Sequence, residues 1–199
     1  DELQKILEID RSSQYGHLSD DEFATLAQFV RKTSDTFMIE GAAASTLDGF
    51  EFDIQLKPGA RPFAATLGRM SPVQEERESH HVRAYEDKGH VRIPTEAQRS
   101  PWAAKCHVVV KKDSEWGRMI CDFRELNRAT IGHPAPVGDM HGKVRGIAGY
   151  LYKSGLDAYA GFNQMKASEN ATRLMQVLFA RGVRQFTVLP FGVTNGPAY

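Results

Sequence analysis

Residues 105–122 read KCHVVVKKDSEWGRMICD, and this stretch carries the clearest local structural signal in the chain. A β-rich run over 105–111 and a second over 117–122 flank the turn-forming pair Asp113-Ser114. Runs of β-branched residues on both sides of a short polar turn are typical of two strands joined by a tight connection. The stretch therefore predicts a β-hairpin centred near Ser114.

The two cysteines of the chain, Cys106 and Cys121, lie roughly opposite each other in such a hairpin. Two cysteines in 199 residues do not form a disulfide framework, and reduced compartments keep thiols free. The sequence therefore predicts buried free thiols, with a cross-strand disulfide as the alternative. An intracellular, reduced compartment is the default assumption, and the sequence identifies the compartment no further.

Two helix starts are marked by capping signals. Ser19 opens a capping box and the apolar residues that follow repeat on one face, which predicts a helix over 20–31. Ser71-Pro72 combines an N-cap residue with a proline at the first helical position, and Gly89 is the predicted stop. Both segments are therefore predicted to be helices that begin after a serine cap.

Other segments are predicted to be extended or irregular. Apolar residues alternate with period two over 50–56, which predicts a strand. Short strands are also predicted over 151–156, where the strand delivers Asp157, and over 186–189. The segment 134–149 is rich in glycine and proline and is predicted to be irregular.

Charge is unevenly distributed along a chain whose formal net charge is zero. The net charge is −7 over residues 1–60, +1 over 61–100 and +6 over 101–199. A basic half suits a phosphate-bearing partner, and an ordinary solvated surface is the alternative. The sequence contains no apolar run of the length, about 18 residues or more, that a transmembrane helix requires.

Three stretches of the chain form an ordered set of motifs. They are RSPWAAKCHVVVKKDSEWGRMICDFRELNRAT (99–130), SGLDAYAGFNQM (154–165) and FTVLPFGVTNGPAY (186–199). In this order and at these spacings, they resemble the fingers and early palm of reverse transcriptases encoded by Gypsy-type LTR retrotransposons and retroviruses. The similarity runs from about Lys57 to Tyr199.

The resemblance implies an α+β fold of the right-hand polymerase type, with a fingers subdomain, an incomplete palm and an N-terminal helical segment. It divides the chain into an N-terminal linker and helical segment (1–56), a fingers-like region with the 105–122 hairpin (57–150) and a partial palm with the first two palm motifs (151–199).

The same resemblance implies a metal-binding role for Asp157. Polymerases of this type hold two Mg²⁺ ions with an aspartate at this place, and the metals activate the primer 3′-OH and stabilise the leaving pyrophosphate. The backbone carbonyl of Ala158 would add a second hard oxygen ligand. For Asp157 by itself, a helix cap at a strand end is the alternative.

Nucleotide-binding residues are implied in the same way. Phe162, five residues after the aspartate, would lie under the sugar and select deoxynucleotides. Lys111 and Arg118 match the fingers residues that reach the triphosphate, with Lys112 as an adjacent candidate, and Phe191 would line the nucleotide and template side. A guanidinium suits bidentate contact with phosphate oxygens. Ordinary solvated side chains are the alternative for the three cations.

As a function, the resemblance implies an RNA-directed DNA polymerase, which transfers dNTPs to a primer 3′-OH on a template. The family's third palm motif, an aromatic-x-Asp-Asp turn, does not occur before Tyr199. The chain by itself is therefore expected to be inactive and to bind no catalytic Mg²⁺, with a protein covering the incomplete palm. A non-catalytic adaptor subunit of a larger assembly and a nucleic-acid-binding module without catalysis are the alternatives.

Overall fold

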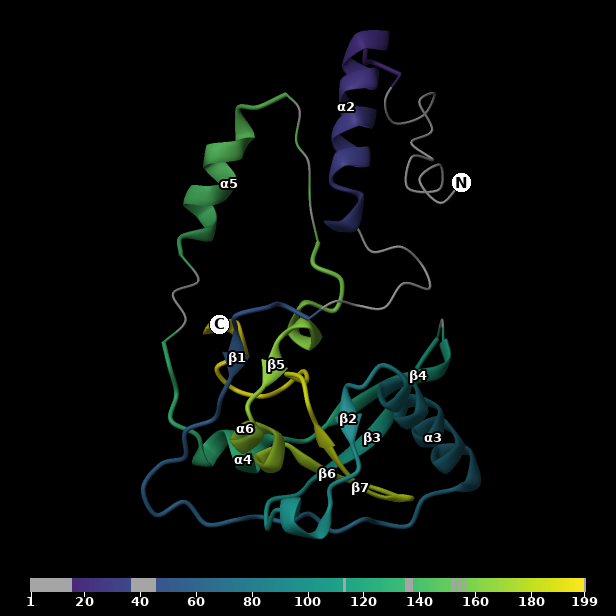
Figure 1. Ribbon diagram of the computed structural model, residues 1–199, viewed down its shortest axis with the longest axis vertical. Coiled ribbons are helices and arrows are strands. Elements are labelled where there is room, and N and C mark those ends of the chain that lie inside the picture. Colours follow the sequence, from purple (N-terminus) through teal and green to yellow (C-terminus); the bar gives the residue numbers. More distant parts are fainter. Residues whose placement is uncertain are drawn as a thin grey trace. The chain divides into compact units, whose positions relative to one another are not determined.

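The computed structural model describes residues 16–36, 46–112, 114–134, 138–151, 153, 155 and 157–198. The chain divides into two compact units, Asp1–Ala44 and Ser45–Tyr199. The first unit contains the helix α2 (Asp20–Lys32) and the 3-10 turn η1 (Ser34–Thr36) (Figure 1).

The helix α2 begins at the predicted capping box. The Glu22 N–H donates to the Ser19 hydroxyl over 3.3 Å, and the Ser19 N–H donates to the Glu22 carboxylate over 2.8 Å. Ala27 and Val30 are the buried residues of the helix. The predicted helix over 20–31 is therefore confirmed and is one residue longer.

The second unit contains a five-stranded sheet with the strand order β2-β7-β6-β3-β4. Neighbouring strands pair antiparallel except β3 and β6, which pair parallel. Figure 1 labels these strands, which are β2 (Val91–Arg92), β3 (Ala104–Lys111), β4 (Ser114–Cys121), β6 (Gln176–Phe179) and β7 (Gly182–Phe186).

Shorter elements surround this sheet. The strands β1 (Glu51–Phe52) and β5 (Lys166–Ala167) pair parallel as a second, two-stranded sheet. The helices are α3 (Pro72–Asp87), α4 (Arg124–Ala129), α5 (Met140–Ala148) and α6 (Glu169–Leu174), and the 3-10 turns are η2 (Glu96–Gln98), η3 (Gly161–Gln164) and η4 (Gly196–Ala198).

The core forms where α3, α4 and α6 meet the five-stranded sheet. Phe123 and Phe186 are almost fully buried and meet edge to face with ring centroids 6.3 Å apart. Tyr85 of α3 packs edge to face on Phe186 at 5.6 Å. Aromatic pairs of this geometry stabilise a core beyond the apolar area that they bury. None of the helices in the described residues has both the length and the apolar content that a membrane crossing needs.

Most predicted elements are present, with changed bounds. The hairpin over 105–122 and the helix after Ser71 are confirmed, and Gly89 follows that helix with a left-handed φ of 67°. The strand predicted over 50–56 shortens to Glu51–Phe52, although Phe52 and Ile54 are buried as the alternation predicts. The strand predicted over 186–189 is wrong in position, because β7 ends at Phe186.

Two predictions near the middle of the chain fail. The segment 134–149 is not wholly irregular, because Met140–Ala148 forms α5 despite its glycines, each of which costs about 1 kcal/mol relative to alanine in a helix. Of the segment 151–156, the described residues Leu151, Lys153 and Gly155 are not in a strand, and the others lie outside the described residues. The predicted subdomain boundaries stay predictions.

The prediction of free thiols is wrong, because Cys106 and Cys121 form a disulfide. The two residues pair directly across β3 and β4, with their Cα atoms 4.1 Å apart. Directly opposed residues in an antiparallel pair bring their Cβ atoms within bonding reach of two sulfurs. The alternative of a cross-strand disulfide is therefore the one that the structure contains.

One carboxylate is buried between α3 and the β6–β7 turn. Glu78 is 2% exposed, and its Oε2 accepts the N–H of Ala180 over 2.7 Å. Its Oε1 has no partner among the described residues. Burial raises the pKa of the Glu78 carboxyl above its ordinary value of 4.5, and the charge of Glu75 acts in the same direction.

Reduction of the disulfide is expected to destabilise the protein. The bridge closes a loop with a sequence separation of 15, for which chain-entropy arguments give about 3 kcal/mol. Urea denaturation with and without reductant should show this loss in the wild-type chain, while Cys121→Ser should start lower and be insensitive to reductant. A wild-type curve that reductant leaves unchanged would contradict the disulfide.

Glu78 is expected to make stability depend on pH. A carboxyl whose folded pKa lies above its unfolded value contributes stability that is present below the unfolded pKa and is lost as pH rises through the folded pKa. The free energy of unfolding of Glu78→Gln, relative to wild type, should therefore increase as pH rises from about 4.5 to 8. Urea denaturation across this range measures it, and Glu76→Gln, at an exposed position of α3, is the control. Parallel pH profiles for Glu78→Gln and wild type would refute the prediction.

Candidate functional site

Two aromatic rings form the centre of the candidate site. Phe162 lies in η3, and Phe191 lies in the turn that follows Pro190. Their ring centroids are 5.3 Å apart and the rings meet edge to face at 81°. Phe191 is 63% exposed, and both rings border a depression of about 350 Å³. The structure therefore brings two of the predicted nucleotide-binding residues together at an open surface.

The loop that carries Phe191 is held in place by Asn127 of α4. Asn127 Nδ2 donates to the carbonyl oxygen of Gly192 over 2.7 Å, and its Oδ1 accepts the N–H of Thr194 over 2.8 Å. One amide side chain thus satisfies a backbone acceptor and a backbone donor of the loop. Sequence reasoning missed Asn127, because a motif does not show which backbone groups a side chain contacts.

Asn195 holds the other end of the same loop. Its backbone is left-handed with φ at 68°, a conformation that asparagine adopts more readily than most residues. Its Oδ1 accepts the N–H of His133 and its Nδ2 donates to the Ile131 carbonyl, both over 2.8 Å. An asparagine directly before Gly196 in a turn-rich stretch is the signal that could have identified it.

The segment around Phe162 is fitted closely to this loop. Ala160 has a left-handed φ of 47°, which turns the chain into η3. The buried Asn163 donates to the Leu189 carbonyl over 3.2 Å. A Cβ atom on Gly196 would lie only 3.3 Å from Phe162 Cε1. The absence of a side chain at Gly196 therefore allows the Phe162 ring to lie close to the backbone of the facing loop. Phe162 is thus placed by its own turn and by a glycine of the facing loop.

Asp157 and Ala158 precede this turn and are exposed. Asp157 does not cap η3, whose N-cap position is Ala160. A carboxylate and a backbone carbonyl are hard oxygen ligands of the kind that Mg²⁺ prefers. Within the part of the chain that the structure describes, however, no three histidine, cysteine, aspartate or glutamate side chains are grouped to hold a metal ion. Asp157 therefore fits a magnesium site only as one of several ligands.

The predicted triphosphate-binding residues lie at the tip of the β3–β4 hairpin. Arg118 pairs with Val109 in the ladder, and Arg118 and Lys112 are both exposed. The backbone of Lys111 pairs with Ser114, while its side chain lies outside the described atoms. Among the described residues, no hydrogen bond, ion pair or ring contact joins this tip to the Phe162 region. A joint action of the two groups on one nucleotide therefore stays a prediction.

A bulge directs the hairpin tip toward α3. Between the pairs Val109–Arg118 and Lys111–Ser114, one residue of β3 lies opposite three residues of β4. Gly117, one of these three, adopts a left-handed φ of 67°. Trp116 stacks on His80 with ring centroids 4.0 Å apart, and a His81 ring nitrogen lies 3.1 Å from the Trp116 carbonyl oxygen. The extra residues of a bulge reorient side chains, and here the tip is anchored to α3 through Trp116.

A charged pair lies at the base of the hairpin. Arg124 Nε and Nη2 donate to the two carboxylate oxygens of Asp122 over 2.8 and 2.7 Å. These hydrogen bonds lower the pKa of Asp122 to about 2. The Asp122 carboxylate is therefore ionised at neutral pH and engaged by Arg124 beside α4.

Comparison with known proteins relates half of the chain to polyproteins. No protein-family model matches. The chain is 31% identical over 103 residues, 50% of its length, to the retrovirus-related Pol polyprotein from transposon opus of Drosophila melanogaster. It is 28% identical over 103 residues to that from transposon 297 of the same organism, and 30% identical over 98 residues to the putative enzymatic polyprotein of Cassava vein mosaic virus. The chain spans 10% of each Drosophila polyprotein and 14% of the viral one.

The fold is similar to that of a retroviral enzyme. The crystal structure of a prototype foamy virus protease-reverse transcriptase mutant superposes with a TM-score of 0.70 at 20% identity, covering 91% of this chain and 24% of that chain. The mixed α/β architecture is thereby confirmed. Across 41–50% of its length the chain has retrotransposon Pol polyproteins and viral enzymatic polyproteins as homologues, which confirms the resemblance that its motifs indicate.

Loss of the Asn127 amide is expected to loosen the Phe191 loop. Asn127→Ala leaves the Thr194 N–H and the Gly192 carbonyl without their partner and should lower the free energy of unfolding by about 1–3 kcal/mol. Amide exchange at Thr194 should accelerate. Arg128→Ala, which removes an exposed ion pair with Glu125 on the same helix, should cost less than about 1 kcal/mol. Unchanged exchange at Thr194 would show that Asn127 does not hold the loop.

Proposed function

We propose that this chain supplies the fingers and the first two palm motifs of an RNA-directed DNA polymerase. The observation that carries the proposal is the Phe162–Phe191 pair at an open depression, with Asp157 five residues before Phe162. The homology of half the chain to Pol polyproteins supports the same reading. The reaction is template-directed transfer of a deoxynucleotide to a primer 3′-OH.

In this proposal the two phenylalanines bind the incoming nucleotide. Phe162, which the close approach of Gly196 holds in place, lies against the sugar and leaves no room for a ribose 2′-OH. Phe191 is exposed and offers a ring for stacking or packing against the nucleotide or the template. Neither ring donates or accepts a proton, so both act through shape and stacking.

Asp157 and the carbonyl of Ala158 would hold Mg²⁺. The metal, when bound, activates the primer 3′-OH and stabilises the leaving pyrophosphate. These two groups are too few for a metal pair, and in this proposal an aromatic-x-Asp-Asp segment supplies the further carboxylates. Lys111, Lys112 and Arg118 would bind the triphosphate, with Arg118 suited to bidentate contact.

A second candidate function is that of a non-catalytic adaptor, which the exposed face of α5 favours. Met140, Val144 and Ile147 recur at helical spacing and are 60%, 58% and 54% exposed. Apolar side chains that share one helix face are commonly covered by another protein surface. A partner protein bound to this face of α5 would be consistent with an adaptor. The remainder of a polymerase could cover the same face equally well.

A primer-extension assay tests the polymerase proposal. A polypeptide that contains this chain together with an aromatic-x-Asp-Asp segment should extend a DNA primer on an RNA template with Mg²⁺. Asp157→Asn should lower the rate by about a hundredfold or more, because a metal ligand is lost. Phe162→Ala should raise the use of ribonucleotides relative to deoxynucleotides. Asp139→Asn, an exposed aspartate before α5, is the control and should leave the rate unchanged.

Two outcomes would argue against polymerase function. The first is absence of incorporation in every form that contains the chain, and the second is an unchanged rate in Asp157→Asn. Template-primer binding that weakens steeply with salt, without incorporation, would instead favour a nucleic-acid-binding module, consistent with the net charge of +6 over residues 101–199.

A further inference from the structure

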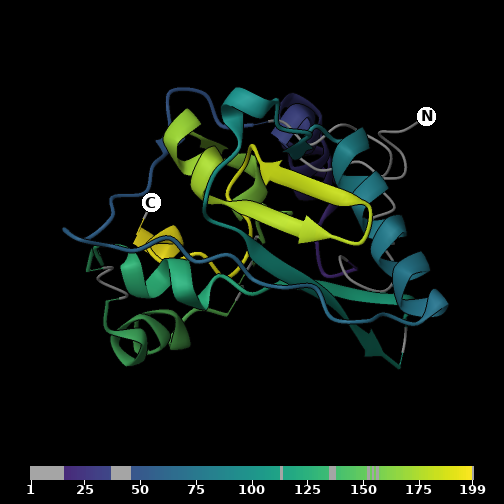
Figure 2. The same ribbon diagram turned by 90° about the horizontal axis from the view of Figure 1, so that it is seen from below.

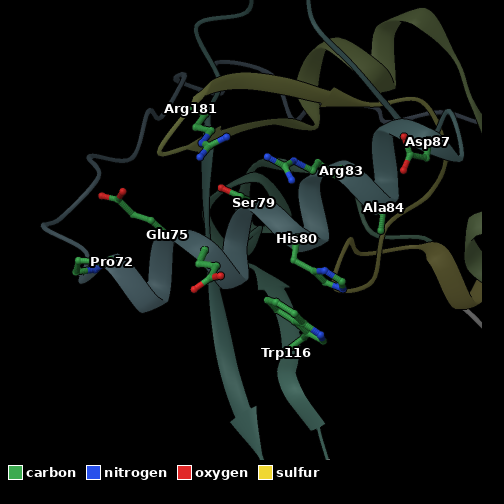
Figure 3. Close-up of a pocket in the computed structure, with 10 residues that line it drawn as sticks. Pro72, Glu75, Ser79, His80, Arg83, Ala84, Asp87, Trp116 and Arg181 are labelled. Atoms are coloured by element: carbon green, nitrogen blue, oxygen red, sulfur yellow. The ribbon is translucent and has the colours of Figure 1, made fainter.

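A small cavity lies between α3 and the β6–β7 turn, away from the Phe162 region in sequence. Its volume is about 120 Å³, and its lining includes Ser79 and Arg83 of α3, Arg181 of the turn and Arg184 of β7. It adjoins a larger depression of about 510 Å³ that shares Ser79, Arg83 and Arg181 (Figure 3). Figure 2 shows β6 and β7 as a hairpin beside α3.

Two contacts fix the turn to the helix on either side of this cavity. The buried Glu78 accepts the Ala180 N–H over 2.7 Å, directly before Arg181 in the chain. Arg184 Nε donates to Glu86 Oε1 over 2.5 Å. Arg83 lies on α3 between Glu78 and Glu86, and Arg181 lies between Ala180 and Arg184. The two contacts therefore fix the backbone of both arginines.

Two exposed arginines, Arg83 and Arg181, border the cavity. Figure 3 shows the Arg83 and Arg181 side chains pointing toward one another above Ser79. In the part of the chain that the structure describes, neither guanidinium makes a hydrogen bond or an ion pair. Glu86, the carboxylate in the lining of the cavity, is already paired with Arg184. The two guanidinium groups repel each other, and an anion bound between them would be attracted to both.

We propose that Arg83, Arg181 and the Ser79 hydroxyl bind a phosphate group or another tetrahedral oxyanion in this cavity. Two guanidinium groups offer paired N–H donors to phosphate oxygens, and the serine hydroxyl offers a further donor. The cavity volume of about 120 Å³ gives room for a group of several water-sized oxygens such as phosphate.

The surroundings favour a single compact phosphate over a polynucleotide backbone. Three carboxylates, Glu75, Glu76 and Asp87, line the adjoining depression. A polyanion that ran through the depression would meet these negative charges along its length, whereas a single phosphate needs only the space between Arg83 and Arg181. The ligand class is therefore inorganic phosphate or the terminal phosphate of a small ester, and the site is independent of the proposed polymerase centre.

Titration with inorganic phosphate tests the proposal. Isothermal titration, with sodium chloride matching the ionic strength, should show millimolar binding to the wild-type chain. Arg83→Gln and Arg181→Gln should each weaken binding by about tenfold, because each removes charge-assisted hydrogen bonds. The double variant should show no binding up to about 50 mM phosphate. Phosphate should also raise the thermal midpoint of the wild type and not that of the double variant.

The matched control removes two exposed arginines elsewhere. Arg61→Gln/Arg69→Gln has the same change in net charge and should bind phosphate within about twofold of the wild type. Circular dichroism checks that each variant is folded. Equal phosphate affinity in the wild type and the Arg83→Gln/Arg181→Gln variant, or equal loss in the control, would overturn the proposal, as would absence of binding to the wild type.

A second titration, with a twelve-nucleotide oligothymidylate, identifies the source of the phosphate. Unchanged oligonucleotide binding in the Arg83→Gln/Arg181→Gln variant supports a small phosphate as the ligand. Oligonucleotide binding that falls in parallel with phosphate binding overturns this assignment, because the cavity would then serve a polynucleotide backbone.

Discussion

The parallel pairing of β3 with β6 is the constraint on which the second unit depends. Ala104 pairs with Val177 and Lys105 with Leu178, so an early hairpin is joined to a late one within a single sheet. The buried Gln176 completes this junction, since its Nε2 donates to the carbonyl oxygens of Ser100 and Trp102 over 2.9 and 3.1 Å. Parallel strands cannot be joined by a tight turn, and long-range contacts of this kind must overcome the entropy of closing a long loop.

The candidate site follows from this junction. Once β3 and β6 are paired, the segment that leaves the hairpin, which contains α4, lies beside the loop that leaves β7. Asn127 and Asn195 then bond the backbone of the two segments together, and the loop presents Phe191 to Phe162. The aromatic pair therefore depends on polar contacts made between residues more than sixty positions apart in the chain.

Local signals predicted the local structure well. The two serine capping boxes begin α2 and α3, because a serine cap acts on backbone groups only three residues away. The hairpin register followed from its turn and places Cys106 opposite Cys121, although free thiols were preferred to the cross-strand disulfide that the structure contains. The helix α5 was not predicted because its segment is rich in glycine, which disfavours helix, whereas Met140, Val144 and Ile147 recur at helical spacing.

The sequence by itself determined the helix starts, the hairpin and the motifs that relate half of the chain to Pol polyproteins, since these depend on neighbouring residues and on their order. Of the predicted site, it identified Phe162 and Phe191 without showing that their rings meet. Only the tertiary structure decided that contact, the roles of Asn127 and Asn195, and the cavity between Arg83 and Arg181. Each of these joins residues that are close only after β3, β6 and β7 have formed one sheet, so no local pattern encodes them.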